Sequence, residues 1–139
     1  MLSTYLISKD MLSVTITTTY AIANSLLNNN KYNYFDFVSN TDIVNRLKII
    51  HEFVEEIMDD RKCQKSRTLR LCIESVESSI KEINNILERI NTNYMNYRNS
   101  WFRYFYRFDC SNDIDKLKNK IEILEARSNM LLKIKSAIY

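Results

Sequence analysis

Apolar residues recur at alternating intervals of four and three along the stretch from Ser66 to Phe108. This spacing is held for about five heptads, so it predicts one apolar face along a long helix. From Tyr94 the face changes from aliphatic to aromatic. We expect the helix to break or bend between Asn91 and Asn99, because asparagine is a poor helix former. The positions of this face are Leu69, Ile73, Val76, Ile80, Ile83, Leu87, Ile90, Tyr94, Tyr97, Trp101, Tyr104 and Phe108.

Three further segments carry the same periodicity, and each predicts a helix. The first covers about Asp10 to Asn28, the second about Asp42 to Asp60, and the last runs from about residue 111 to the end. The aromatic segment 31–38 is expected to pack under one end of the helices, as a loop or as a short extra helix. The apolar positions of the three helices are Met11 or Leu12, Ile16, Tyr20, Ala23 and Leu27; Ile43, Leu47, Ile50, Val54 and Ile57; and Ile114, Leu117, Ile121, Leu124, Leu131, Ile134 and Ile138.

Short polar residues mark where the predicted helices begin. Ser66 is placed to accept a hydrogen bond from a free backbone N–H at the start of the long helix. Thr41 or Asn40 is expected to cap the second helix in the same way. Ser111 or Asn112 is expected to cap the last one.

The chain of 139 residues contains no glycine and no proline, which narrows the fold class. Hairpins, barrels and glycine-rich phosphate loops need residues that adopt positive φ, so the composition excludes them. An all-α fold remains, in a single domain that spans residues 1–139. We predict an antiparallel four-helix bundle in which the third helix is the longest.

The segment from Met11 to Leu27 carries no charge, which admits several interpretations. It is shorter than a comfortable membrane-spanning helix, and its threonines lower the helix propensity because they are β-branched. It also faintly resembles a signal peptide, although the charged pair Lys9 and Asp10 precedes it. We interpret residues 1–30 as the first helix of the bundle, which either packs on the other helices or detaches from them to meet a membrane.

The sequence offers few residues that could catalyse a reaction or bind a metal ion. His51 has no second histidine or cysteine at ligand spacing, so we interpret it as a partly exposed bundle histidine. The chain has an odd number of cysteines and no CxxC pair, which favours a reducing compartment and a cytoplasmic location. The three cysteines are Cys63, Cys72 and Cys110. We therefore expect neither an enzyme nor a bound cofactor or metal.

Charge is distributed unevenly along the chain, although the formal net charge is only +3. Residues 1–60 carry four basic and eight acidic side chains, whereas residues 61–110 carry ten and five. On sequence alone, the densest basic run is best read as a solvated turn between helices, and its functional interpretation is a patch for anionic headgroups or phosphates. This run has no acidic member and consists of Arg61, Lys62, Lys65, Arg67 and Arg70.

Aromatic and basic residues alternate in the segment 101–108, which reads WFRYFYRF. One interpretation is an aromatic plug at the end of the core, with arginines stacked on the rings. The others are contact with a membrane interface or a protein partner, and stacking on a single-stranded nucleic acid, which we favour least. The candidate contacts to a membrane or partner are Trp101, Phe102, Tyr104 and Phe105, and the candidate anion contacts are Arg98, Arg103 and Arg107.

A long third helix that ends in aromatic and basic residues is followed by a short turn and a last helix that reads IDKLKNKIEILEARSNMLLKI. This layout resembles the N-terminal four-helix bundle of mixed-lineage kinase domain-like proteins and the related HeLo-type domains of fungal and plant cell-death proteins. The preceding stretch IVNRLKIIHEFVEEI is similar to their second helix. The resemblance covers about residues 42–135.

The resemblance implies a cytoplasmic bundle that oligomerises, is recruited to anionic membrane lipids and perturbs the membrane to kill the cell. The basic run at 61–70 would then make the first lipid contacts, and the three arginines at 98–107 the second. The rival hypothesis is a helical interaction module without membrane activity. Such a module would be an adaptor or a viral host-modulating bundle, similar to a Bcl-2-like inhibitor, that binds a helical protein partner. A plain coiled-coil homo-oligomer is a third hypothesis.

Overall fold

The computed structural model describes the backbone of residues 2–138 and the side chains of residues 12–138. Every regular element in that part of the chain is helical, which confirms the predicted all-α class. The elements in chain order are α1 (Leu2–Asn28), α2 (Asp36–Asn40), α3 (Ile43–Asp59), α4 (Arg61–Gln64), α5 (Arg67–Arg98), the 3₁₀ helix η1 (Trp101–Tyr104) and α6 (Ser111–Ile138).

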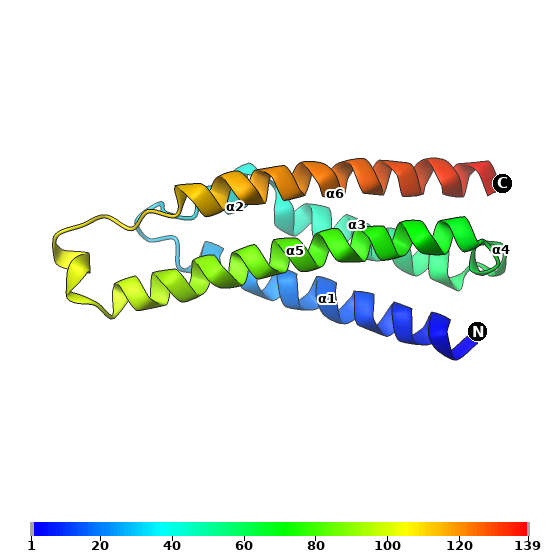
Figure 1. The fold of residues 1–139 in the computed structure, drawn as a ribbon, viewed down its shortest axis with the longest axis horizontal. Coiled ribbons are helices and arrows are strands. Elements are labelled where there is room, and N and C mark those ends of the chain that lie inside the picture. The colour runs from blue at the N-terminus through cyan, green and yellow to red at the C-terminus, as the bar shows by residue number, and fades with distance from the viewer. Residues whose placement is uncertain (1, 139) are drawn as a thin grey trace.

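The four long helices α1, α3, α5 and α6 form an elongated bundle in which consecutive long helices run in opposite directions (Figure 1). The beginning of α1, the end of α6 and the connection through α4 lie at one end of the bundle. The segment between α5 and α6 extends beyond the other end. The predicted four-helix bundle with a long third helix is therefore confirmed.

The longest helix, α5, is the centre of the packing. It packs most extensively against α6 and α1, whereas α3 packs mainly against α1. The backbones of α3 and α5 scarcely approach each other, so α4 carries the chain across the end of the bundle between two helices that are not close neighbours. The serine predicted to start α5 does so, because the Ser66 hydroxyl accepts a hydrogen bond from the Leu69 N–H at 3.1 Å.

The apolar face predicted for α5 is buried from Leu69 to Tyr94 and forms the spine of the core. Burying an aliphatic side chain of this size contributes about 1.5–3 kcal/mol relative to leaving it exposed. The faces predicted for α3 and α6 are buried as well, except for four half-buried positions: Ile50 of α3 and Ile114, Ile134 and Ile138 of α6. In α1 the predicted positions Leu12, Ile16 and Ala23 are buried, Tyr20 is half-buried, and Leu26 is buried in place of Leu27. The pattern of apolar residues therefore accounts for which face of each helix turns inward.

Polar side chains fix how far α6 is shifted along α5. Arg127 donates one hydrogen bond to the Ser75 carbonyl at 2.9 Å and another to the Ser79 hydroxyl at 2.7 Å. Nearer the start of α6, Arg89 pairs with Asp113 at 2.7 Å. These polar contacts form only when α6 lies at one position along the axis of α5. Burial of apolar side chains alone defines that position only loosely.

Among the long helices that pack together, α3 and α6 have the least extensive contact. The two helices share few contacts and enclose a cleft of about 130 Å³. Arg46 of α3 spans it to Glu125 of α6, at 3.2 Å. The Ser128 hydroxyl is buried beside this cleft and has no hydrogen-bond partner among the described residues.

The first helix begins earlier than predicted, at Leu2 instead of near Asp10. It packs against α5 and α3. Within the threonine-rich centre, Thr19 is buried and its hydroxyl donates to the Thr15 carbonyl at 2.7 Å. Detachment of α1 from the bundle stays a prediction.

The predicted cap of α3 is wrong. The Thr41 hydroxyl points back and donates to the Phe37 carbonyl at 2.7 Å, so neither Thr41 nor Asn40 caps the helix. The residue before α3 is Asp42, which adopts the left-handed conformation with φ of 54°. With neither glycine nor proline in the chain, this tight connection falls to an aspartate, one of the few other residues that tolerate the left-handed region.

The predicted cap of α6 is also wrong by two or three residues. The carboxylate of Asp109 accepts a hydrogen bond from the Ser111 N–H at 2.9 Å, in place of a bond to Ser111 or Asn112. This bond holds the pKa of Asp109 below its usual range. A charged acceptor competes better for a helix N–H than a neutral one, which explains why the earlier aspartate takes the position.

The aromatic segment 31–38 packs under one end of the bundle, and the short extra helix expected there is α2, which begins at Asp36. Phe35 is fully buried, with its ring centroid 4.9 Å from that of Tyr94 and 6.1 Å from that of Phe108. Both pairs meet steeply, which aromatic rings favour over face-to-face stacking. We call the rings that meet here the aromatic cluster, which consists of Tyr34, Phe35, Tyr94, Tyr97 and Phe108.

Replacing Phe35 with alanine is expected to lower the free energy of unfolding by about 3–5 kcal/mol, because it empties the centre of the aromatic cluster. Urea unfolding followed by circular dichroism measures the change. Tyr32→Ala is the matched control, since Tyr32 lies in the same segment but is mostly exposed, and it should shift stability by less than about 0.5 kcal/mol. Equal effects of the two substitutions would contradict the described packing.

Candidate functional site

The aromatic face predicted to continue along one helix to Phe108 does not do so. Helix α5 ends at Arg98, within the stretch where a break was expected. The N–H of Asn99 bonds back to the Met95 carbonyl at 3.1 Å, and the Ser100 hydroxyl accepts from the Phe102 N–H at 3.2 Å to start η1. The heptad spacing of the rings beyond Arg98 is therefore not a core pattern.

The segment that follows this break extends beyond the end of the bundle (Figure 1), and its rings from Trp101 to Tyr106 are exposed. Trp101 is 62% exposed and Phe105 is 72% exposed. Trp101 stacks on Phe102 with centroids 4.4 Å apart and meets Phe105 edge-on at 5.7 Å. We call this surface the aromatic tip, which consists of Trp101, Phe102, Tyr104, Phe105 and Tyr106.

The aromatic tip is attached to the bundle by contacts with the aromatic cluster. Phe108 folds back into the aromatic cluster, with its centroid 5.3 Å from that of Tyr94. The Tyr97 hydroxyl donates to the Tyr106 carbonyl at 2.5 Å. Partial burial and a hydrogen bond with Tyr34 raise the pKa of Tyr97. The tip is thus a braced loop that displays rings, and the interpretation of the whole segment as a core plug holds only for Phe108.

The structure brings together the three arginines predicted near the tip, and all three are exposed. Arg103 donates to the Arg98 carbonyl and to the Tyr104 hydroxyl, both at 2.6 Å. Arg107 lies over the Tyr34 ring, 5.4 Å from its centroid. Rings and guanidinium groups therefore share one end of the molecule.

A groove of about 750 Å³ opens behind the aromatic tip, between the end of α1 and the end of α5. Its basic lining residues are Lys31, Arg98 and Arg103, and none of its lining residues is acidic. We call it the basic groove, and its other lining residues are Asn28, Asn29, Tyr32, Tyr34, Tyr94, Tyr97 and Tyr104.

The basic run at 61–70 lies at the opposite end of α5. The two ends of this 32-residue helix are about 48 Å apart at 1.5 Å per residue. Two acidic residues flank the run: Asp60, between α3 and α4, caps α4 by accepting from the Lys62 N–H at 2.8 Å, and Glu74 lies one turn after Arg70 in α5. The members Arg61, Lys62, Lys65 and Arg67 are exposed, and Arg70 is half-buried.

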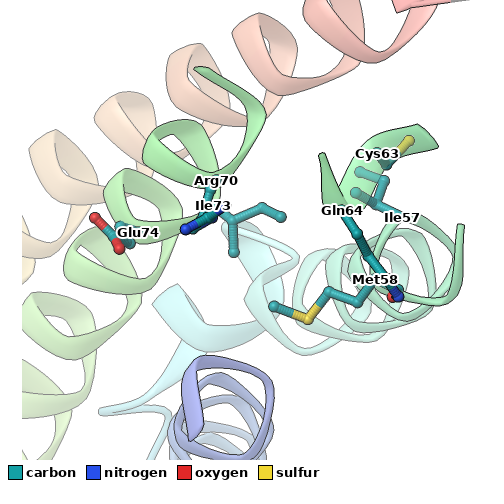
Figure 2. A pocket seen from close by; sticks show the side chains of 7 residues that line it. All are labelled: Ile57, Met58, Cys63, Gln64, Arg70, Ile73 and Glu74. Carbon is teal, nitrogen blue, oxygen red and sulfur yellow. The ribbon is translucent and has the colours of Figure 1, made fainter. Parts of the chain in front are cut away.

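The space beside Arg70 is too small for a ligand. Side chains of α3 and α4 face Arg70, Ile73 and Glu74 of α5 across it, as Figure 2 shows. Its volume is about 10 Å³, which is about what a single water needs. The structure therefore separates the two predicted basic sites, and of these two only the one at the tip adjoins exposed rings and a groove.

Sequence reasoning missed Lys31 and Tyr106 as members of this region. Lys31 follows the end of α1 and reaches the groove only because the aromatic cluster brings its segment against the end of α5. The signal that could have found it was the aromatic run beside it, since segment 31–38 was predicted to pack at a bundle end. Tyr106 belonged to the aromatic segment but not to the candidate contacts.

Nothing in the described part of the chain forms a metal site of three or more histidine, cysteine or carboxylate groups. His51 is half-buried and lies 3.5 Å from Glu55 one turn later in α3, as expected for a bundle histidine. The three cysteines are free thiols. Within the described residues, the helices are too short or too polar to cross a lipid bilayer.

Comparison with known protein families, with curated proteins and with solved structures finds no match for this chain. The resemblance to HeLo-type and mixed-lineage kinase domain-like bundles therefore stays a prediction.

The thiol of Cys110 reports whether the tip stays packed. Partial burial, together with the carboxylates of Asp109 and Asp113, raises the pKa of Cys110 to about 11. In the native chain at pH 8, alkylation of Cys110 by iodoacetamide should therefore be slower by about two orders of magnitude than in the urea-unfolded chain, because only the thiolate reacts. The native rate should rise with pH toward 11. Peptide mass spectrometry measures both rates, and equal rates would show that the turn before α6 is not packed as described.

Proposed function

We propose that this protein is a helical bundle that binds anionic membrane surfaces through its aromatic tip and the arginines around it. The observation that carries the proposal is the exposure of five aromatic rings within six residues, at one end of the bundle. Monomeric soluble proteins rarely expose such a contiguous apolar patch without a binding role. Tryptophan and tyrosine favour the headgroup level of a bilayer, where one side of the ring is apolar and the other is wet.

The charges near the tip favour an anionic surface. A basic residue close to such a surface contributes about 1 kcal/mol, and Arg98, Arg103 and Arg107 all lie at this end. A bundle that stands on its tip holds the basic run at 61–70 about 48 Å from the bilayer, far beyond the Debye length of about 8 Å. The tip therefore replaces the run at 61–70 as the first lipid contact in the proposal.

The proposal also includes two later steps: the protein oligomerises, and it kills the cell by perturbing the membrane. They are supported by the resemblance to cell-death bundles and by the absence of charge between Met11 and Leu27 in α1. In this scheme the protein starts in the cytoplasm, the tip binds lipid, and α1 separates from α5 and α3. Leakage of dye from anionic vesicles would support this part, and binding without leakage would limit the function to docking.

The double substitution Trp101→Ala with Phe105→Ala should lower binding to vesicles of phosphatidylcholine and phosphatidylserine by tenfold or more. Both rings are exposed, so the fold should remain intact while the buried apolar area at the interface is lost. Vesicle co-sedimentation measures the change.

Met130→Ala with Leu132→Ala is the matched control, because these side chains are 58% and 50% exposed on α6, away from the tip. This control should bind as the unsubstituted chain does. The proposal fails if the chain does not bind anionic vesicles, or if the tip substitutions leave binding unchanged.

A protein-interaction module is the second candidate. Tryptophan, tyrosine and arginine are the residues that most often dominate binding energy at protein interfaces, and all three occur at the tip. A stoichiometric protein partner that is lost on Trp101→Ala, in a chain that ignores vesicles, would favour this candidate. Light scattering that shows a monomer at all concentrations would exclude the coiled-coil oligomer.

A further inference from the structure

The basic groove collects positive charge without acidic partners, unlike several basic side chains elsewhere in the bundle. Arg46, Arg89 and Lys120 each pair with a carboxylate at 3.2 Å or less. The basic residues of the groove, by contrast, have no carboxylate in salt-bridge distance among the described residues, and no acidic residue lines the groove. Low-dielectric walls of aromatic side chains strengthen the field of such uncompensated charges.

One cation of the groove is already fixed in place. The Arg103 guanidinium donates to the Arg98 carbonyl and to the Tyr104 hydroxyl, and it lies over the Tyr104 ring at 4.7 Å from the centroid. A guanidinium carries five N–H groups, so these two bonds leave donors for a ligand. A fixed side chain also loses less conformational entropy when a ligand binds than a mobile one does.

The size and the donor set of the groove indicate the class of ligand. Its volume of about 750 Å³ is within the range of small-molecule sites. Three cations, with asparagine amides and tyrosine hydroxyls around them, present donors and no competing negative charge. A phosphomonoester has the complementary chemistry, because it carries a charge of about −1.5 to −2 at pH 7 and three strong acceptor oxygens.

We infer that the basic groove binds a phosphomonoester group through Lys31, Arg98 and Arg103. The group is carried either by a membrane lipid or by a soluble molecule. In the lipid form the inference rests on the proposed function, since the aromatic tip then holds the bilayer surface beside the groove. In the soluble form it is independent of membrane binding.

Titration of the full chain with glycerol 3-phosphate tests the soluble form. The Nε–Hε signals of Arg98 and Arg103 in a nitrogen-15 correlation spectrum should shift and saturate, whereas glycerol at equal ionic strength should leave them in place. Lys31→Gln should weaken the binding several-fold. It is the preferred variant because Lys31 is exposed and takes no part in bracing the tip.

Arg61→Gln with Arg67→Gln removes two exposed charges at the far end of α5 and should leave the titration unchanged. An equal loss of affinity in this control would show that only net charge matters and would overturn the inference. Absence of any saturable shift with glycerol 3-phosphate would overturn the soluble form.

Vesicles distinguish the lipid form from the proposed function. Vesicles of phosphatidylcholine with phosphatidic acid, which carries a phosphomonoester, are compared with phosphatidylserine vesicles of matched surface charge. The chain should prefer phosphatidic acid by about tenfold, and Lys31→Gln should remove most of this preference while binding to phosphatidylserine persists. Equal binding to the two lipids would overturn the lipid form and leave the proposed function standing, whereas binding to neither would overturn the proposed function.

Discussion

The meeting of three distant segments at the aromatic cluster is the contact on which the rest of the tip depends. Phe35 comes from the segment after α1, Tyr94 from the last turns of α5, and Phe108 from the chain that returns from the tip. Without this cluster the loop between α5 and α6 would be held only at its two ends and by the hydrogen bond from Arg103 to the Arg98 carbonyl. The rings inside the cluster pack against one another, whereas the five rings of the aromatic tip are exposed and available to contact a binding partner.

The aromatic residues of the apolar face predicted for α5 have two different roles, because some are buried and others are exposed. Tyr94 closes the aliphatic core of α5, whereas Trp101 and Tyr104 lie in solvent although they follow the same spacing. The break at Arg98 causes this division, since it turns the chain out of the helix before the pattern ends. The arginines between the exposed rings then stack on tyrosines and bond to carbonyls, so charge and apolar surface occur together at one end.

Sequence periodicity was sufficient for the fold because the buried face of each helix depends on spacing alone, as the run from Leu69 to Tyr94 shows. It was insufficient for the tip, where spacing suggested burial for Trp101 and Tyr104 and the chain had already left the helix. The basic groove could not be predicted either, because Lys31 joins Arg98 only through tertiary packing. The predicted cap of α5 at Ser66 is present, but the caps predicted for α3 and α6 are wrong for a local reason: a neighbouring aspartate, Asp42 or Asp109, takes the position.

The position of α3 in the bundle has a consequence for the way the molecule opens. This helix packs mainly on α1, leaves a cleft of about 130 Å³ against α6 and is joined to α5 by the short helix α4. Its backbone hydrogen bonds are therefore protected by fewer neighbours than those of α5. Local opening costs least free energy where packing is sparse. Amide hydrogens of α3 should accordingly exchange with solvent before those of α5, so the bundle opens from the side of α3 while the pair α5–α6, which carries the tip, stays closed.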